Sequence, residues 1–146
     1  MQEIILLKGL PASGKSTWAK DFVEHHVEYV RVNKDDLREM LNIREFSRRG
    51  EKVVLELERE IGKAALSLGK SLIVDDTNLN PIHAEFWSGI ASANDLEYSE
   101  ITFDTSLEEC IERDSKRVKS VGNDAIIGMY KKYIKNQKNQ KNQIKQ

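Results

Sequence analysis

Short apolar runs alternate with longer amphipathic segments along this chain. The apolar runs are rich in isoleucine, leucine and valine, which is typical of strands buried on both faces of a sheet. The segments between them space their apolar residues three or four positions apart, which predicts helices. The predicted strands span residues 3–8, 28–33, 71–74 and 98–103. The predicted helices span residues 15–26, 35–41, 47–68, 107–117 and 124–135, and one more begins at Asn80-Pro81.

Strands that alternate with helices predict a parallel sheet with helices on both faces. We therefore expect an α/β fold of three layers with about four strands in the central sheet. The longest predicted helix ends at Gly69. The apolar stripes of the two longer helices consist of Val53, Leu57, Ile61, Ala64 and Leu68, and of Ile82, Phe86 and Ile90.

A glycine-rich motif at residues 9–17 joins the first predicted strand to the first predicted helix. Its sequence, GLPASGKST, fits the phosphate-binding pattern G-x-x-x-x-G-K-[ST] in the strand–loop–helix context that this pattern requires. With this motif, we expect the three-layer fold to be similar to that of P-loop nucleotide-binding proteins, with a helical lid. Lys15 would reach the β- and γ-phosphates, and the Ser16 hydroxyl would hold Mg²⁺. The alternative is a turn without a ligand. The expected site for ATP or another nucleoside triphosphate comprises Gly9, Leu10, Pro11, Ala12, Ser13, Gly14, Lys15, Ser16 and Thr17.

Length and composition fit one globular domain with a low-complexity end. The 146 residues are 39% hydrophobic, and no apolar stretch approaches the roughly 20 residues of a membrane span. The net charge of −1 includes six lysines after Tyr130 and is −7 without them, so a polyanion would need a local basic groove. We expect a domain at residues 1–134 and a KNQ-repeat tail without a packed core at residues 135–146.

The first candidate for acid–base chemistry is Asp35, with Arg38 three residues further on the same helix face. Asp35 follows the second predicted strand, and the carboxyl ends of parallel strands line the ligand crevice of an α/β sheet. It could accept a proton from an attacking hydroxyl. Alternatively, Asn33 caps the helix while Asp35 and Asp36 favour its dipole. The spacing alone leaves both interpretations open.

Two further clusters carry charges suited to phosphoryl transfer. Asp75 and Asp76 follow the third strand, where kinases place a Mg²⁺-linked aspartate, although the segment could also be a simple turn. Strand alternation lets only one of these two acids face the site. Arg113 and Arg117 lie four positions apart on a helix capped by Ser106, and they form either a lid over the polyphosphate or a solvent-exposed face. The single cysteine, Cys110, fits a small buried residue in a reducing compartment, and the histidines lack metal-ligand spacing.

Several longer motifs follow one another along the chain as far as about Tyr133. They are GLPASGKSTWAK, NKDDLR, DDTNLNP and ERDSKR, and MYKKY follows the last of these. With these motifs in this order, the chain resembles the 5′-kinase domain of phage-type polynucleotide kinase. The DTNLNP and R-x-S-K-R motifs are far more specific than a phosphate loop. The resemblance implies Asp35 as general base, Arg38 as ligand of the acceptor's 3′-phosphate, Asp76 and Thr77 beside the acceptor end, and Arg113 and Arg117 as the lid.

The resemblance implies an ATP- and Mg²⁺-dependent kinase that phosphorylates the 5′-hydroxyl end of DNA or RNA. Lys34 departs from the family pattern, which has arginine there, and no phosphatase region follows, so we expect no phosphatase activity. We expect a cytoplasmic enzyme of a bacterial or phage-infected cell, either a homo-oligomer or the partner of a separate phosphatase or ligase. The alternatives are a kinase for a sugar acid or antibiotic hydroxyl, and a nucleotide-dependent switch protein. The expected catalytic residues are Lys15, Asp35, Arg38, Arg113 and Arg117.

Overall fold

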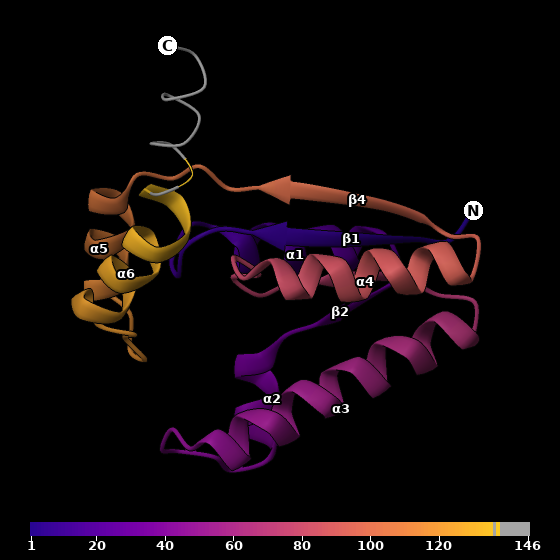
Figure 1. Cartoon of the computed structure of the whole chain (residues 1–146), viewed down its shortest axis with the longest axis horizontal. Coiled ribbons are helices and arrows are strands. Elements are labelled where there is room, and N and C mark those ends of the chain that lie inside the picture. The colour runs from indigo at the N-terminus through magenta and orange to yellow at the C-terminus, as the bar shows by residue number, and fades with distance from the viewer. Residues whose placement is uncertain (136, 138–146) are drawn as a thin grey trace.

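The computed structural model describes residues 1–135 and 137, and a four-stranded sheet in the order β2-β3-β1-β4 forms its centre (Figure 1). The strands are β1 (Glu3–Lys8), β2 (Tyr29–Val32), β3 (Ser71–Val74) and β4 (Glu97–Thr102). The helices are α1 (Lys15–His25), α2 (Lys34–Met40), α3 (Arg48–Ser67), α4 (Pro81–Ala93), α5 (Leu107–Ser115) and α6 (Asn123–Met129), and the π-helix η1 (Tyr130–Lys135) follows α6.

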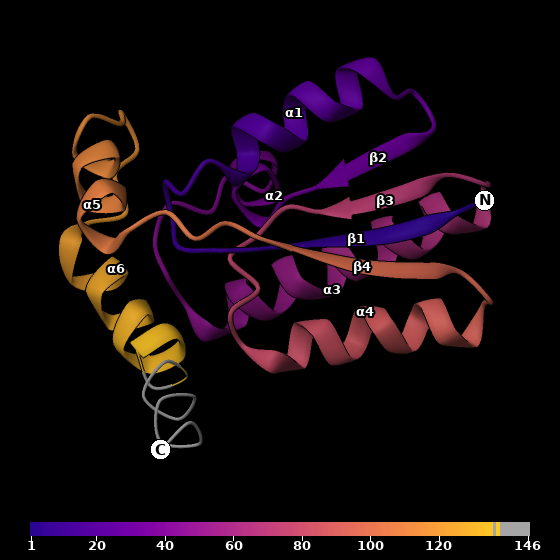
Figure 2. The ribbon, with the colours of Figure 1, turned by 90° about the horizontal axis from the view of Figure 1, so that it is seen from above.

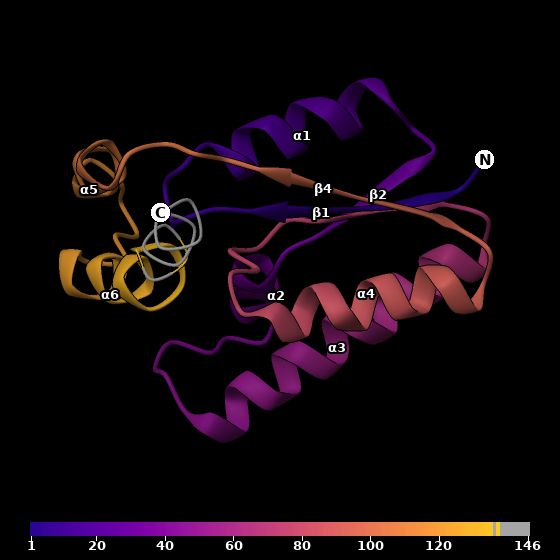
Figure 3. The same ribbon diagram turned by 45° about the horizontal axis from the view of Figure 1, so that its top comes forward.

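Helices cover both faces of the sheet, which confirms the predicted α/β fold of three layers. Helix α1 lies on one face, and α3 and α4 lie on the other (Figure 3). All paired strands are parallel, and α5 and α6 lie beyond the ends toward which the strands point (Figure 2). Those two helices therefore occupy the position expected for a lid. None of the helices within residues 1–135 has the length and apolar composition that crossing a membrane requires.

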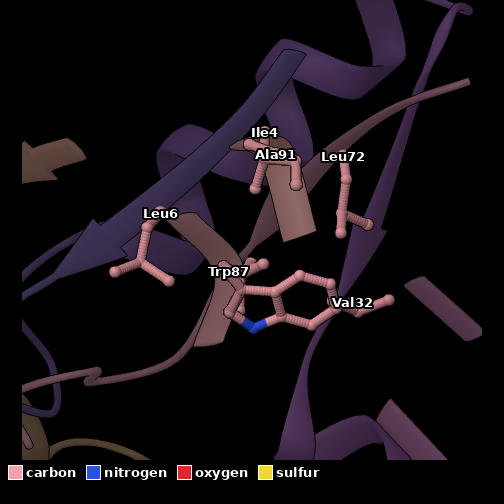
Figure 4. Packing of buried hydrophobic residues seen from close by; sticks show 7 residues of the cluster. Ile4, Leu6, Val32, Leu72, Trp87 and Ala91 are labelled. Atoms are coloured by element: carbon pink, nitrogen blue, oxygen red, sulfur yellow. The ribbon is translucent and has the colours of Figure 1, made fainter. Parts of the chain in front are cut away.

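The core consists of two layers because neighbouring side chains of a strand point to opposite faces of the sheet. Ile4 and Leu6 of β1 pack with Trp87 of α4 (Figure 4). Ile5 and Leu7, which alternate with them, form a second cluster on the side of α1. The central strand is thus buried on both faces, as its unbroken apolar run predicts.

Helix α3 packs through a different face from the one that its apolar stripe predicts. Its buried residues are Val54, Glu58, Gly62 and Ala65, whereas Val53, Leu57, Ile61 and Leu68 are exposed. Gly62 explains the difference, because a Cβ there would lie 2.5 Å from Cη2 of Trp87. The helix therefore makes its closest approach at a residue without a side chain. Similarly, α4 buries Trp87 and Ala91, while Ile82 is exposed.

The predicted helix starts are largely correct because they depend on local capping. The side chains of Asn33, Asn80 and Ser106 each accept a backbone N–H at the start of α2, α4 and α5. Glu109 does not close a capping box, since its side chain binds Arg113 instead.

The helix ends depart more from prediction. Helix α5 ends at Ser115 rather than at residue 117, and the predicted helix at 124–135 is divided between α6 and η1. Cys110 is buried, as expected. The predicted tail at 135–146 lies outside the described residues except for 135 and 137.

Candidate active site

The phosphate loop folds around its own lysine. Nζ of Lys15 donates to the carbonyl oxygens of Gly9, at 2.9 Å, and Leu10, at 2.7 Å. It also lies 3.2 Å from Oγ of Ser13. Burial lowers the pKa of Lys15 to about 8. A phosphate beside this ammonium group would offset the cost of burying the charge and raise the pKa again.

Two glycines give the loop its shape. A Cβ at Gly9 would lie 2.7 Å from Oγ of Ser13 and 3.0 Å from the carbonyl oxygen of Phe103, so a larger residue does not fit. Gly14, directly before α1, has a φ of +103°, which favours glycine. The N–H of Gly9 donates to the carbonyl oxygen of Thr77 at 3.1 Å. These contacts fix the loop at the carboxyl edge of the sheet.

A cavity of about 640 Å³ opens beside the loop, within the size range of small-molecule sites. Its walls come from the phosphate loop, the ends of β2 and β3, the segment 43–51, and the region around α5 and α6. The expected site residues that line it are Pro11, Ala12, Lys15, Ser16, Asp35, Arg38, Asp76, Thr77 and Arg117. Those that do not line it are Gly9, Leu10, Ser13, Gly14, Thr17 and Arg113.

Asp35 and Arg38 form an ion pair at the start of α2. Nη1 of Arg38 donates to Oδ1 of Asp35 at 2.6 Å, and two further nitrogens donate to Glu51 of α3 at 2.8 and 2.7 Å. The hydrogen bonds to Glu51 are the main reason why the pKa of Arg38 is raised. Asn33 provides the helix cap. Asp35, which is 75% exposed and lines the cavity, is therefore available to an attacking hydroxyl.

Asp75 and Asp76 have different partners, but both line the cavity, so the expectation that only one faces it is wrong. The reason is that they follow the last residue of β3, where strand alternation no longer applies. Oδ2 of the fully buried Asp75 accepts from Nε of Arg31 at 2.7 Å. Oδ1 of Asp76 accepts the backbone N–H of Lys34 at 2.8 Å.

Lys34 links three elements in a buried cluster that the sequence did not indicate. Its Nζ lies 3.1 Å from a carboxylate oxygen of Glu58 on α3 and 3.1 Å from one of Asp76. Burial alone would lower the pKa of Lys34. The carboxyl groups of Asp76 and Glu58 together have a larger opposite effect, so the pKa of Lys34 is raised. Burial, reinforced by Asp76, raises the pKa of Glu58 to about 9. Burial and Lys34 lower the pKa of the nearby His83 to about 4, which keeps this cavity residue neutral.

Asn78, which the sequence analysis included only as part of the DDTNLNP motif, lines the cavity and connects β1 with β3. It is buried, with a φ of +46°, and its Nδ2 donates to the carbonyl oxygen of Leu7 at 2.8 Å. The same group lies 3.2 Å from the carbonyl oxygen of Val74. An asparagine in the segment between a strand and the next helix is a sequence signal for such a turn.

The two candidate lid arginines occupy different environments, which corrects the prediction that they share a helix face. Arg117 lies in the turn after α5 and lines the cavity, with Nη1 3.7 Å from Oδ1 of Asp114. Arg113 pairs with Glu109 at 2.7 Å, the partner that a solvent-exposed face would give it. A Cβ atom placed on Gly14 would nevertheless lie only 3.8 Å from Nη1 of Arg113. Arg113 is therefore beside the phosphate loop, and Arg117 is nearer to the cavity.

The phosphate-loop side of the cavity has oxygen atoms suited to bind a magnesium ion. Ser16 and Asp75 line the same cavity, and the buried Oδ1 of Asp75 has no hydrogen-bond partner among the described residues. Within those residues, no three His, Cys, Asp or Glu side chains form a metal cluster. A hydroxyl and a single carboxylate fit Mg²⁺, which takes its remaining ligands from water and phosphate.

Two relatives match most of this chain. A protein of Autographa californica nuclear polyhedrosis virus, provisionally named a bifunctional polynucleotide kinase/RNA ligase, is 29% identical over 92% of the chain and 21% of its own length. The L-seryl-tRNA(Sec) kinase of Methanococcus maripaludis is 30% identical over 89% of the chain and 52% of its own length. The chain thus spans about a fifth of the first relative and about half of the second.

Solved structures share the fold. A chain of the Pnkp1/Rnl/Hen1 RNA repair complex superposes with a TM-score of 0.74 and 26% identity, covering 88% of this chain and 42% of that one. The APS kinase CysC of Mycobacterium tuberculosis has a TM-score of 0.63 and 23% identity, covering 79% of this chain and 69% of that one, which supports the fold alone. Residues 4–136 match the family model described as the AAA domain, and this chain belongs to that family.

Proposed function

We propose that this chain is a polynucleotide 5′-hydroxyl kinase that transfers the γ-phosphate of ATP to a 5′-hydroxyl end of DNA or RNA. The observation that carries the proposal is the placement of the phosphate loop and the Asp35–Arg38 pair on the same cavity. A relative named for polynucleotide kinase activity and a structural neighbour from an RNA repair complex support the choice of acceptor.

In this proposal, each charged group of the cavity has one task. Lys15 neutralises the donor phosphates, and Arg117 stabilises the charge that develops during transfer. Asp35 accepts the proton of the attacking 5′-hydroxyl, and Arg38 binds an acceptor phosphate. Bound Mg²⁺, held by Ser16 and Asp75, would supply further neutralisation of the donor phosphates.

The proposal extends to the arrangement of the whole chain. Residues 1–134 would be the kinase domain, and residues 135–146 a lysine-rich tail outside it. A separate phosphatase or ligase would act on the same nucleic-acid ends, because end repair joins a 5′-phosphate made by one activity to an end prepared by another. The structural neighbour comes from a complex titled Pnkp1/Rnl/Hen1, which supports such a partner.

A labelled-phosphate assay tests this function. The protein would be incubated with γ-labelled ATP, Mg²⁺ and one acceptor at a time. The acceptors are a 5′-hydroxyl oligonucleotide, the same oligonucleotide with a 5′-phosphate, seryl-tRNA, and small sugar acids or antibiotics. The proposal predicts labelling of the 5′-hydroxyl oligonucleotide alone, with the label removed by a 5′-phosphatase. Labelling of only seryl-tRNA or a small molecule would overturn it.

A further inference from the structure

One large aromatic side chain lies exposed at the edge of the active-site cavity. Phe46 is 81% exposed and belongs to the segment between α2 and α3. Its neighbours Ile43, Arg44 and Glu45 also line the cavity, on the same wall as Arg38 and Glu51. Burial of a phenylalanine normally stabilises a protein, so a largely exposed ring that lines a ligand cavity is suited to a ligand that covers it.

Positive charge flanks this ring in the sequence. The segment 44–49, REFSRR, has three arginines and one glutamate. Within residues 1–135 and 137, Arg38 is held by two carboxylates, but Arg44, Arg48 and Arg49 have no ion pair to a carboxylate. Arg44 donates only to the side-chain oxygen of Asn42, at 3.2 Å. Arg48 and Arg49 form the first turn of α3, where positive charge opposes the helix dipole and is mildly destabilising.

We propose that Phe46 stacks on a base of the acceptor strand and that Arg44, Arg48 and Arg49 bind its phosphates beyond the reacting end. This inference rests on the proposed polynucleotide kinase function and extends it to a second contact region. An aromatic ring accepts any base, and arginines track the backbone without reading sequence. The surface therefore favours a single-stranded 5′ end of any sequence, because an unpaired base can unstack from its neighbours and stack on the Phe46 ring.

A nucleic acid fits this surface better than a protein partner does. The ring lies on the cavity that contains Asp35, so its ligand continues into the reaction site. The arginines form a basic segment in a chain whose first 130 residues carry a net charge of −7. An acidic protein could bind the arginines, but its binding would not require that the ring and the arginines lie beside the phosphate-transfer site.

Steady-state kinetics with a single-stranded 5′-hydroxyl oligonucleotide test the stacking contact. Phe46→Ala should raise the KM for the oligonucleotide about tenfold, the loss typical of one base–aromatic contact, with little change in kcat. Phe46→Tyr should restore the KM because tyrosine retains a ring. Leu68→Ala is the matched control: Leu68 is also 81% exposed, but it lies at the opposite end of α3 and should not affect the KM.

A base-free acceptor separates stacking from a structural role. Oligonucleotides that lack one base at a chosen position near the 5′ end would be compared. At the position that stacks on the ring, the missing base should raise the KM of the wild-type protein. The same missing base should not raise the KM of Phe46→Ala, which has already lost the stacking contact. Equal losses in both proteins at every position would overturn the stacking contact. Replacing Arg44, Arg48 and Arg49 together by glutamine should lower the salt dependence of oligonucleotide binding, and an unchanged salt slope would overturn the phosphate contacts.

Binding without ATP distinguishes this inference from the proposed function. If no oligonucleotide is phosphorylated by the wild-type protein, the kinase proposal fails. Anisotropy of a fluorescein-labelled oligonucleotide then still reports whether Phe46→Ala weakens binding. If phosphorylation occurs and Phe46→Ala leaves both the KM and the binding constant unchanged, only the inference about Phe46 fails. The ring would then serve another partner.

Discussion

The two halves of the cavity, which the proposed function assigns to the phosphate donor and to the acceptor, are held by different kinds of contact. In the donor half, the backbone supplies the partners: carbonyl oxygens of the loop bind Lys15, and the Gly9 N–H binds Thr77. In the acceptor half, side chains of separate elements pair with one another. Arg38 of α2 binds Glu51 of α3, and Lys34 contacts both Glu58 and Asp76.

This difference determines what each half tolerates. A loop made of main-chain contacts keeps its shape when a side chain is replaced, except where glycine is required. A network of partly buried polar side chains loses more when one member is removed, because the remaining group is left without its hydrogen-bond partner. Substitutions in the donor half should therefore change chemistry with little effect on folding, whereas those in the acceptor half should affect both.

The largest effect is expected at Lys15. Lys15→Ala should reduce transfer to every acceptor to background, because the charge that neutralises the donor phosphates is lost while the loop backbone remains. Circular dichroism should stay native. Lys20→Ala, an exposed lysine on the same helix, is the control and should keep full activity. Substantial turnover by folded Lys15→Ala would remove the donor site from this loop.

The second largest effect is expected at Arg117, which lies on the cavity near the donor half. Arg117→Ala should lower kcat about a thousandfold, as for arginines that act in cis on a transferring phosphoryl group. Arg117→Lys should rescue little, because a point charge cannot bridge two phosphate oxygens. Arg113→Ala should cost less, since Arg113 does not line the cavity.

Measurements of kcat and melting temperature at both positions decide whether these arginines act on the substrate. Lys116→Ala and Lys119→Ala provide the background, because both lysines are exposed and close in sequence. Equally small effects at all four positions would mean that the segment after α5 is a solvent-exposed surface.

The acceptor half is tested next by Asp35→Asn, which preserves shape but cannot accept a proton at neutral pH. We expect kcat to fall about a hundredfold or more, with nearly unchanged ATP affinity. Asp36→Asn is the matched control, since Asp36 pairs with Arg31 and does not line the cavity. It should cost stability rather than rate. If Asp35→Asn alters only the melting temperature, Asp35 is a structural residue.

The smallest effect is a change in the pH dependence of stability at Glu58. Burial raises the pKa of Glu58 from 4.5 to about 9, so the folded protein keeps a proton that the unfolded chain releases in this range. Unfolding then releases a proton, and stability from this group falls as pH rises from 4.5 to about 9.

Glu58→Gln removes this proton linkage and should flatten the fall in melting temperature between pH 6 and pH 9 by roughly ten degrees. The exposed Glu56 on the same helix gives the control variant, Glu56→Gln. Thermal denaturation at several pH values compares the two. The same profile for both variants would contradict a buried, proton-holding role for Glu58.

The strand–loop–helix shape of the phosphate loop could be predicted from the sequence because the hydrogen bonds of Lys15 stay within the loop. Residues 9–17 contain the glycines, the lysine and the hydroxyl that the loop needs, and caps such as Asn33 depend on neighbours three positions away. The acceptor half was predicted only in part. Asp35 and Arg38 were identified, but the bonds of Arg38 to Glu51 and of Lys34 to Asp76 cross 13 and 42 residues.

The packed face of α3 shows the same limit. A stripe of apolar residues favours one face, but the helix packs through Gly62 and Glu58, neither of which contributes to a hydrophobic pattern. Position 62 must be glycine because the Trp87 ring occupies the space of a Cβ there, and Glu58 forms an ion pair with Lys34. Both partners lie on other elements, so no local pattern in residues 48–67 could have indicated them.

Equilibrium binding to two variants tests the division of the cavity most directly. The dissociation constants of Mg²⁺-ATP and of a labelled 5′-hydroxyl oligonucleotide would be measured separately for Lys15→Ala and Arg38→Gln. Lys15→Ala should lose ATP binding and keep oligonucleotide binding. Arg38→Gln should keep ATP binding and bind the oligonucleotide about tenfold more weakly, the effect of one charge-assisted phosphate contact. If both variants lose the same ligand, or if Arg38→Gln weakens ATP alone, the cavity does not have separate donor and acceptor halves.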